Sequence, residues 1–296
     1  METTTTPAGV QFSENLQRRR RAGLIFGAIF FLSTLFGLVA LVVLLVDVVV
    51  TGLPWLNAEF LSGYPSRFPQ RAGIKSAIVG SLYVIGLTGL ISVPVGVASA
   101  LYLEEYAPRH WFVNLVQINI SNLAGVPSIL YGILGLAVFV RFMAFERSVL
   151  AGALTMGLLI LPVIIISTQE ALRAVPEGLR ESAYALGATR WQVIWSHLLP
   201  TAAPGILTGV ILSLSRAMGE AAPLLMIGAL TFVAFLPESI FDQFTVLPIQ
   251  IFNWTSRPQP AFQDLAAAAI IVLMVILLLM NLSAILLRNH FEKLRG

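Results

Sequence analysis

The sequence predicts an all-α membrane protein with six transmembrane helices, on the basis of its composition and its apolar segments. The chain of 296 residues is 57% hydrophobic and only 11% charged, with a mean hydropathy of +0.86. A soluble domain carries about 25% charged residues, so this chain lacks the charged surface that a water-soluble fold needs. Disorder is excluded because disordered chains are poor in hydrophobic residues. The sequence contains no cysteine, which excludes a disulfide scaffold, a thiolate metal site and a cysteine nucleophile.

Six apolar segments are long enough to cross a bilayer, which takes about 20 mostly apolar residues in a helix. The first segment follows four consecutive arginines, Arg18 to Arg21, and is nearly twice as long as the apolar core of a signal peptide, so we expect it to remain as a transmembrane helix. The predicted spans are residues 22–50, 75–103, 112–140, 148–168, 203–230 and 263–288.

The distribution of basic residues predicts the orientation. With the N-terminus inside, most of the 18 lysines and arginines fall on the inner side, as the positive-inside rule requires. We therefore expect both termini, residues 1–21 and 289–296, to lie in the cytoplasm. The loops at 51–74 and 231–262 would then lie outside, with proline to stiffen them and Trp55 and Trp254 at the membrane surface. These loops either dock an external partner or lie at the interface without one.

The polar stretch 169–200 lies between two apolar spans and predicts a helical hairpin on the inner side. Pro176 suits the first turn of a helix, and Glu177 suits its positive N-terminal end. This helix is expected to run to about Leu186, where Gly187 closes it in a left-handed conformation.

A second helix is expected to begin at Thr189, which forms a capping box with Gln192. Pro200 is expected to end it. The hairpin is either a surface connector or a rigid element that another protein grips. The residues spaced as one apolar face of this helix are Trp191, Ile194, Trp195 and Leu198.

The hairpin resembles the cytoplasmic "EAA" motif of the integral-membrane permease subunits of ABC importers. The motif is a Glu-Ala-Ala triplet, a glycine six residues after the glutamate, and a later Ile-x-Leu-Pro. Two positions depart from it, Ser182 for an alanine and His197 for the isoleucine. In that family the hairpin is the coupling helix that docks on the ATPase. The residues that occupy the motif positions and are expected to couple to the ATPase are Glu181, Ser182, Ala183, Gly187, Leu199 and Pro200.

Three further stretches resemble the phosphate-transport permeases within that family, and particularly their PstA subunits. The first runs from Ala124 to Gly132, the second from Ser215 to Pro223, and the third from Leu247 to Phe252. The second stretch also resembles sulfate and molybdate permeases, so it does not fix the anion. The resemblance covers about residues 72–288, which we expect to form the permease domain. The expected remaining segments are the cytoplasmic tail 1–21, the first transmembrane helix 22–50, an outer loop 51–71 and the cytoplasmic tail 289–296.

The resemblance implies an ABC type I importer (MetI-like) permease fold in a bacterial inner membrane, and a subunit that moves phosphate by alternating access. It implies four kinds of partner besides membrane lipid: a second homologous permease subunit, ATPase subunits, an external phosphate-binding protein and phosphate itself. No cofactor, metal or nucleic acid is expected.

Arg216 and Glu220 are the candidate residues of the substrate pathway. A charged side chain within a membrane costs at least about 2.5–3.5 kcal/mol and normally faces protein or water. The two residues are four apart, so they can pair on one helix face, and arginine offers a fixed fork of donors to an oxyanion. Either the two residues form a site that binds the anion transiently during transport, or they form a static ion pair that fixes helix packing.

The sequence contains no Gly-x-x-x-x-Gly-Lys-Ser/Thr loop, so ATP binding by that route is excluded. Neither a His-Glu-x-x-His motif nor a Gly-x-Ser-x-Gly elbow is present, and no catalytic set is recognised. We therefore expect a permease subunit whose ATPase is another chain. The remaining alternatives are a sulfate or molybdate permease subunit, an ion-driven secondary transporter, and an intramembrane enzyme.

Overall fold

The computed structural model describes residues 16–108, 110–229 and 232–293, and most of these residues are helical. The chain divides into two compact units, one ending at Val50 and the other starting at Thr51. Of the two predicted tails, residues 1–15 and 294–296 lie outside the described residues, and the remainder continues helices α1 and α12. Among the described residues five helices are long and apolar enough to cross a membrane, or six if one bent pair is counted as a span, which agrees with the predicted number.

The described residues of the first unit form a single long helix. Helix α1 runs from Leu16 to Gly52, and its most apolar part has a mean hydropathy of 2.9 and no buried residues within the chain. Such an isolated apolar surface is stable in lipid, where the helix satisfies its own backbone hydrogen bonds. The predicted first span at 22–50 lies within this helix.

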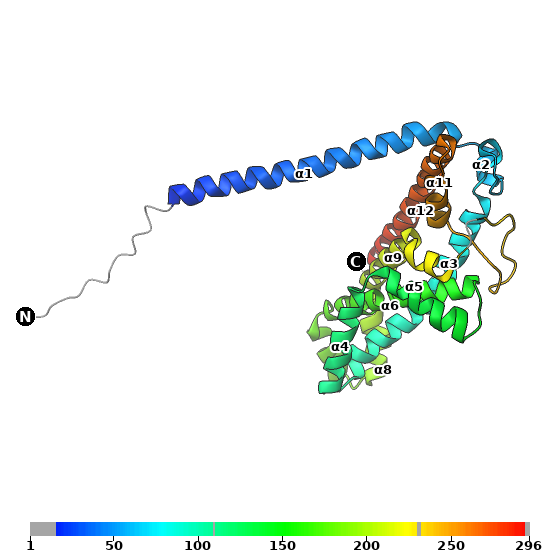
Figure 1. The fold of residues 1–296 in the computed structure, drawn as a ribbon. Coiled ribbons are helices and arrows are strands. Elements are labelled where there is room, and N and C mark those ends of the chain that lie inside the picture. Colours follow the sequence, from blue (N-terminus) through cyan, green and yellow to red (C-terminus); the bar gives the residue numbers. More distant parts are fainter. Residues whose placement is uncertain (1–15, 109, 230–231, 294–296) are drawn as a thin grey trace, which may run out of the picture. The chain divides into compact units, whose positions relative to one another are not determined.

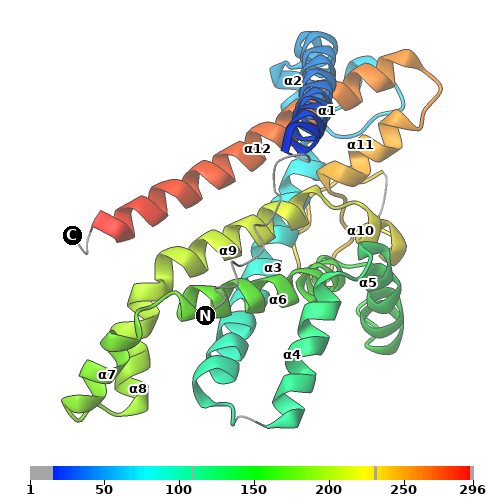
Figure 2. The ribbon, with the colours of Figure 1, turned by 90° about the vertical axis from the view of Figure 1, so that its left-hand side faces the viewer.

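The second unit is built on helix α6, Val149–Arg173. Helices α3 (Lys75–Leu101) and α9 (Leu199–Gly219) pack against α6, and α12 (Pro260–Lys293) packs against α9 (Figures 1 and 2). Two-thirds of the most apolar part of α6 is buried inside the chain, against a third of that of α3. Helix α6 is therefore the core of this unit, and its neighbours keep one face each for lipid or for another protein.

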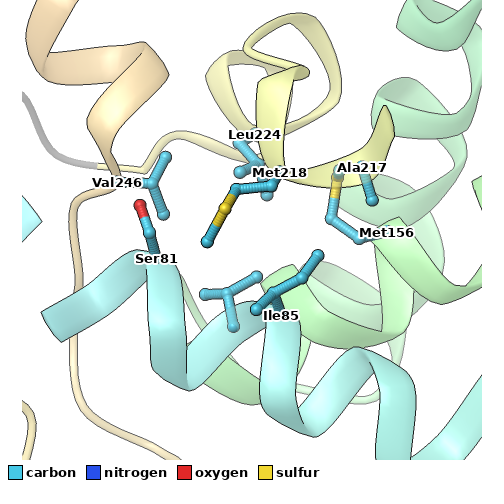
Figure 3. A pocket seen from close by; sticks show the side chains of 8 residues that line it. Ser81, Ile85, Met156, Ala217, Met218, Leu224 and Val246 are labelled. Carbon is cyan, nitrogen blue, oxygen red and sulfur yellow. The ribbon is translucent and has the colours of Figure 1, made fainter. Parts of the chain in front are cut away.

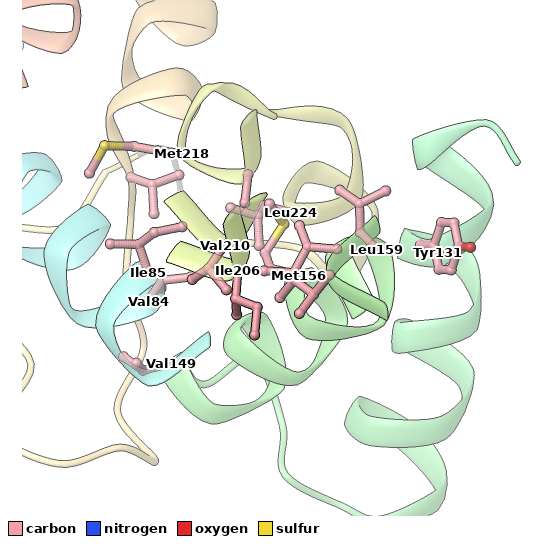
Figure 4. Packing of buried hydrophobic residues seen from close by; sticks show 14 of the residues in the cluster. Val84, Ile85, Tyr131, Val149, Met156, Leu159, Ile206, Val210, Met218 and Leu224 are labelled. Atoms are coloured by element: carbon pink, nitrogen blue, oxygen red, sulfur yellow. The ribbon is translucent and has the colours of Figure 1, made fainter. Parts of the chain in front are cut away.

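The side chains of α6 form the centre of the main apolar cluster, shown in Figure 4. Met156 and Ile160 are each 1% exposed and belong to this cluster, which also includes residues of α3, α9 and the hairpin. Small residues let the helices approach closely. A Cβ on Gly132 of helix α5 (Ser128–Gly135) would lie 2.7 Å from Pro223 of α10 (Ala222–Ile227), so only glycine fits there.

The predicted third span at 112–140 is not one straight helix. Helix α4 (Trp111–Ala124) and the helical segment Ser128–Phe142 meet at 104°. Pro127 caps the second half in an extended conformation, which a residue inside a helix cannot adopt. The Tyr131 hydroxyl donates a 2.7 Å hydrogen bond to the Leu123 carbonyl across the bend, and the same carbonyl accepts a 3.1 Å hydrogen bond from the Val126 backbone N–H.

The predicted fifth span at 203–230 also ends early, because α9 stops at Gly219 and Glu220 has an extended backbone. The prediction that Pro200 ends the hairpin helix is wrong. The chain stays helical from α8 (Arg190–Val193) through the π-helix η5 (Ile194–Leu198) into α9. Pro200 lies in the first turn of α9, a position that tolerates proline.

The two predicted outer loops contain ordered helices. Residues 51–74 include α2 (Ala58–Ser62), and residues 231–262 include α11 (Leu247–Thr255). Trp254 does not lie at a membrane surface, since it is fully buried against Phe60 and Phe262 in a second apolar cluster. Its ring centroid is 6.0 Å from that of Phe60, so this loop is part of the folded unit.

Candidate functional site

The hairpin is held rigidly by its own caps. Helix α7 runs from Glu177 to Ala185, and Gly187 follows with φ +82°, a left-handed conformation that favours glycine. The Thr189–Gln192 capping box is formed at the start of α8, with the Thr189 backbone N–H donating to the Gln192 side chain at 2.8 Å. The predicted glycine turn and capping box are confirmed.

One face of the hairpin is embedded in the core and the other is exposed. Ala183 and Ile194 belong to the main apolar cluster, whereas Glu181 and Ser182 are exposed. Leu186, next to the turn, is 90% exposed. The embedded face anchors the hairpin to the core, and the exposed face leaves Glu181 and the apolar tip at Leu186 accessible.

The predicted apolar face of the second hairpin helix is divided by the structure. Ile194 and Leu198 are buried, but Trp191 and Trp195 are each 61% exposed. The cause is the π-helix over Ile194–Leu198, because a wider helix turn shifts side chains away from the 3.6-residue period assumed from sequence. The two indoles stack with centroids 5.5 Å apart, on the surface.

Arg216 lies in the last turn of α9, at the opposite end from the hairpin. Its side chain is 54% exposed, and its Nε is 3.9 Å from Oε1 of Glu220, whose side chain is 26% exposed. A cation is favourable at the C-terminus of a helix, where the helix dipole is negative. The predicted pair therefore forms, although Glu220 follows the helix end instead of extending the helix.

The residues after Arg216 face the opposite side of α9. Ala217 and Met218 are buried and line a small cavity together with Ser81, Met156 and residues of neighbouring helices (Figure 3). The cavity is apolar, and the Ser81 hydroxyl already accepts a hydrogen bond from the Leu247 backbone N–H. It therefore offers little to an anion, and the charged face of α9 is the surface that bears Arg216.

Sequence reasoning missed two polar contacts that connect helices. Gln117 of α4 and Gln169 of α6 exchange side-chain hydrogen bonds of 2.7 and 3.2 Å. Ser215 donates a 2.9 Å hydrogen bond to Asn281 of α12, one residue before Arg216. Polar residues inside apolar runs were the available signal, but their partners are 52 and 66 residues away in the chain.

Two of the stretches that carry the family resemblance meet in space. Gly132 ends the stretch that starts at Ala124, and Pro223 ends the stretch that starts at Ser215, and these two residues are in contact. The broken span and the Arg216 region therefore form one structural unit, with α5 packed on α10 (Figure 2).

The bent apolar helices are those of a membrane protein, and comparison with known proteins identifies its class as transport permeases. The profile of the family described as "Binding-protein-dependent transport system inner membrane component" matches residues 92–295. The chain therefore belongs to this family of permease subunits, and we treat it as a multi-pass bacterial inner membrane protein.

Several curated relatives carry the name "Phosphate transport system permease protein PstA", and two of them illustrate the similarity. The one from Mycobacterium leprae is 36% identical over 252 residues, covering 82% of this chain and 81% of the relative. The one from Xylella fastidiosa is 34% identical over 286 residues, covering 94% and 97%. A solved bacterial alginate ABC transporter, in complex with its pentasaccharide-bound periplasmic protein, has a chain with 18% identity and a TM-score of 0.65, covering 92% and 96%. The predicted type I importer permease fold is confirmed.

Proposed function

We propose that this chain is the transmembrane permease subunit of an ATP-driven phosphate importer. The observation that carries this proposal is the 34% identity to a phosphate permease over 94% of the chain. The stretches around Gly132 and Pro223, which the sequence shares with phosphate permeases, pack on each other beside Arg216 and Glu220.

The proposed orientation has the hairpin and both termini in the cytoplasm and α2 and α11 outside. The ATPase is another chain, and it docks on the exposed face of the hairpin. The contact residues would include Glu181, Ser182 and Leu186, which are exposed, while Ala183 and Leu198 anchor the hairpin in the core. A second homologous permease subunit and an external phosphate-binding protein complete the transporter, and lipid covers the remaining apolar surface.

The proposed mechanism is alternating access driven from the hairpin. Closure of the ATPase pair displaces the hairpin, and its buried face transmits the displacement to α6 and α9, with which it shares a core. A packed core transmits such movement because it resists compression. The helices then expose the Arg216 face alternately to the two sides of the membrane.

Arg216 is proposed to hold phosphate transiently on this path. Its long contact to Glu220, 3.9 Å, is weaker than a hydrogen-bonded ion pair at 2.7–2.9 Å, so a phosphate oxygen can replace the carboxylate at modest cost. A static pair that only fixes α9 against its neighbours is the competing interpretation.

The test of the proposed function is the uptake of labelled phosphate by the purified transporter in proteoliposomes. ATP is supplied on the side of the membrane that the hairpin faces. We expect ATP-dependent uptake that excess unlabelled phosphate abolishes and excess sulfate or molybdate leaves nearly unchanged. Stronger competition by sulfate or molybdate would reassign the substrate, and uptake driven by an ion gradient without ATP would replace the importer by a secondary transporter.

A further inference from the structure

Three consecutive residues at the hairpin end of α3 each contact an arginine from a different helix. The π-helix η3 spans Tyr102–Tyr106 and continues α3. Its residues Glu104, Glu105 and Tyr106 contact three arginines, and we call these six residues the η3 junction. The arginines, in the same order, are Arg173 at the end of α6, Arg180 in α7 and Arg190 in α8.

In the Glu104–Arg173 contact both carboxylate oxygens accept a hydrogen bond from the guanidinium. Arg173 donates from Nε to Oε1 at 2.9 Å and from Nη2 to Oε2 at 3.0 Å. This two-pronged arrangement is the strong form of an arginine–carboxylate pair. Since α3 and α6 also pack along each other, the pair fixes their ends together, and the two helices are expected to move as one body.

The Glu105–Arg180 contact is incomplete, although it is more buried. The Glu105 side chain is 7% exposed and that of Arg180 is 25% exposed. Nη2 of Arg180 lies 3.1 Å from Oε1 of Glu105 but donates its hydrogen bond to the Leu172 carbonyl at 3.0 Å. Within the described part of the chain, Arg180 Nε and Glu105 Oε1 are buried without a hydrogen-bond partner.

An incompletely bonded buried ion pair contributes little net stability, because desolvation offsets the attraction between the charges. Such a pair can be remade in a second arrangement at small cost, which a complete two-pronged pair cannot. Arg180 lies in the hairpin and directly precedes the motif residue Glu181, so it moves with the element that the ATPase is proposed to grip.

We propose that Glu105 and Arg180 are positioning residues that transmit hairpin movement to α3, while Glu104 and Arg173 hold α3 and α6 together throughout the cycle. The proposal rests on the proposed function and specifies where, within this chain, the displacement enters the membrane helices. The contact of the Arg190 guanidinium with the Tyr106 ring, 5.5 Å from its centroid, ties the second hairpin helix to the same π-helix.

The test compares phosphate transported per ATP hydrolysed by the complete transporter in proteoliposomes. The central variant is the double substitution Glu105→Gln with Arg180→Gln, because it removes both charges and leaves neither buried alone, so folding and assembly should survive. We expect ATP hydrolysis to persist while phosphate per ATP falls by at least about 5-fold, the lower end of ordinary coupling between sites. The matched control is Glu170→Gln, since Glu170 is an exposed partner of Arg173 outside the junction, and it should keep the wild-type ratio.

The single variant Glu105→Gln separates transmission from a structural role. If the single variant loses thermal stability while the double variant is stable and fully coupled, the pair is structural only and the proposal is overturned. A wild-type transporter without ATP-dependent phosphate uptake would instead overturn the proposed function, before any variant is compared.

Discussion

Gly187 has a left-handed backbone and open space around it, since a Cβ there would meet no atom within 4 Å. Any effect of substitution therefore comes from the backbone conformation, which costs a residue other than glycine about 1–2 kcal/mol. The same glycine also sets the angle between the two hairpin helices, next to the exposed tip at Leu186.

We predict that Gly187→Val uncouples ATP hydrolysis from phosphate uptake, because a β-branched residue disfavours this turn and displaces the docking face. The measurement is phosphate transported per ATP. Gly178→Val is the matched control, since Gly178 lies in α7 with equally open space and no positive φ. Wild-type coupling in Gly187→Val, or equal losses in both variants, would contradict this role of the turn.

Arg216 has two interpretations, a residue that binds phosphate transiently and a member of a static ion pair with Glu220, and the two predict different effects of substitution. We predict that Arg216→Ala abolishes phosphate uptake while the complex with the ATPase still assembles, because the transient cationic stop is lost and the helix core is untouched. Arg67→Ala, at an exposed arginine between α2 and α3, should transport normally. Failure of the Arg216 variant to assemble, with normal uptake in any assembled remainder, would support the static pair.

Residues governed by their immediate neighbours were predictable from sequence. The capping box at Thr189 and the turn at Gly187 depend on spacings of three or four residues, and both are present in the structure. The η3 junction was not predictable, because Glu104 and Arg173 are 69 residues apart. The two adjacent glutamates at the end of an apolar span were the signal for it.

At the scale of elements, the broken span is the largest departure from the expected helices. Hydropathy measures how apolar a segment is but not its direction, so residues 112–140 are apolar enough for a span although they bend by 104° at the break. Gly125 and Pro127 marked the position of the break, and Tyr131 stabilises it through its hydrogen bond to Leu123. The π-helices are likewise invisible to a 3.6-residue pattern.

We predict that Tyr131→Phe destabilises the bend by about 0.5–1.5 kcal/mol, the typical net value of one hydrogen bond, because the hydroxyl bond to Leu123 is lost and only the backbone bond from Val126 remains on that carbonyl. The measurement is the thermal unfolding of the purified protein in detergent. Tyr83→Phe is the matched control, since Tyr83 in α3 is 47% exposed, and it should unfold at the wild-type temperature. An unchanged unfolding temperature for Tyr131→Phe would show that the bend does not need this bond.

At the scale of the whole chain, the apolar surface is larger than one subunit can bury. The exposed face of α9 around Arg216, and the exposed hairpin face, are accounted for if a second permease subunit and an ATPase cover them. Composition predicted a membrane protein, and the lengths of the apolar segments predicted the number of spans. The partners and the substrate could be proposed only from the family resemblance and the relatives. The surfaces that would contact them pair with other molecules, and this sequence carries no information about those molecules.

The most direct test of the account uses the absence of cysteine from the sequence. Leu186→Cys introduces a single thiol at the exposed hairpin tip, and Phe68→Cys places one at an exposed site between α2 and α3, as a control. With a short thiol-reactive crosslinker in membranes containing the complete transporter, we predict that Leu186→Cys captures a nucleotide-hydrolysing protein and that Phe68→Cys does not. Full labelling of Leu186→Cys without capture of such a protein would contradict the account.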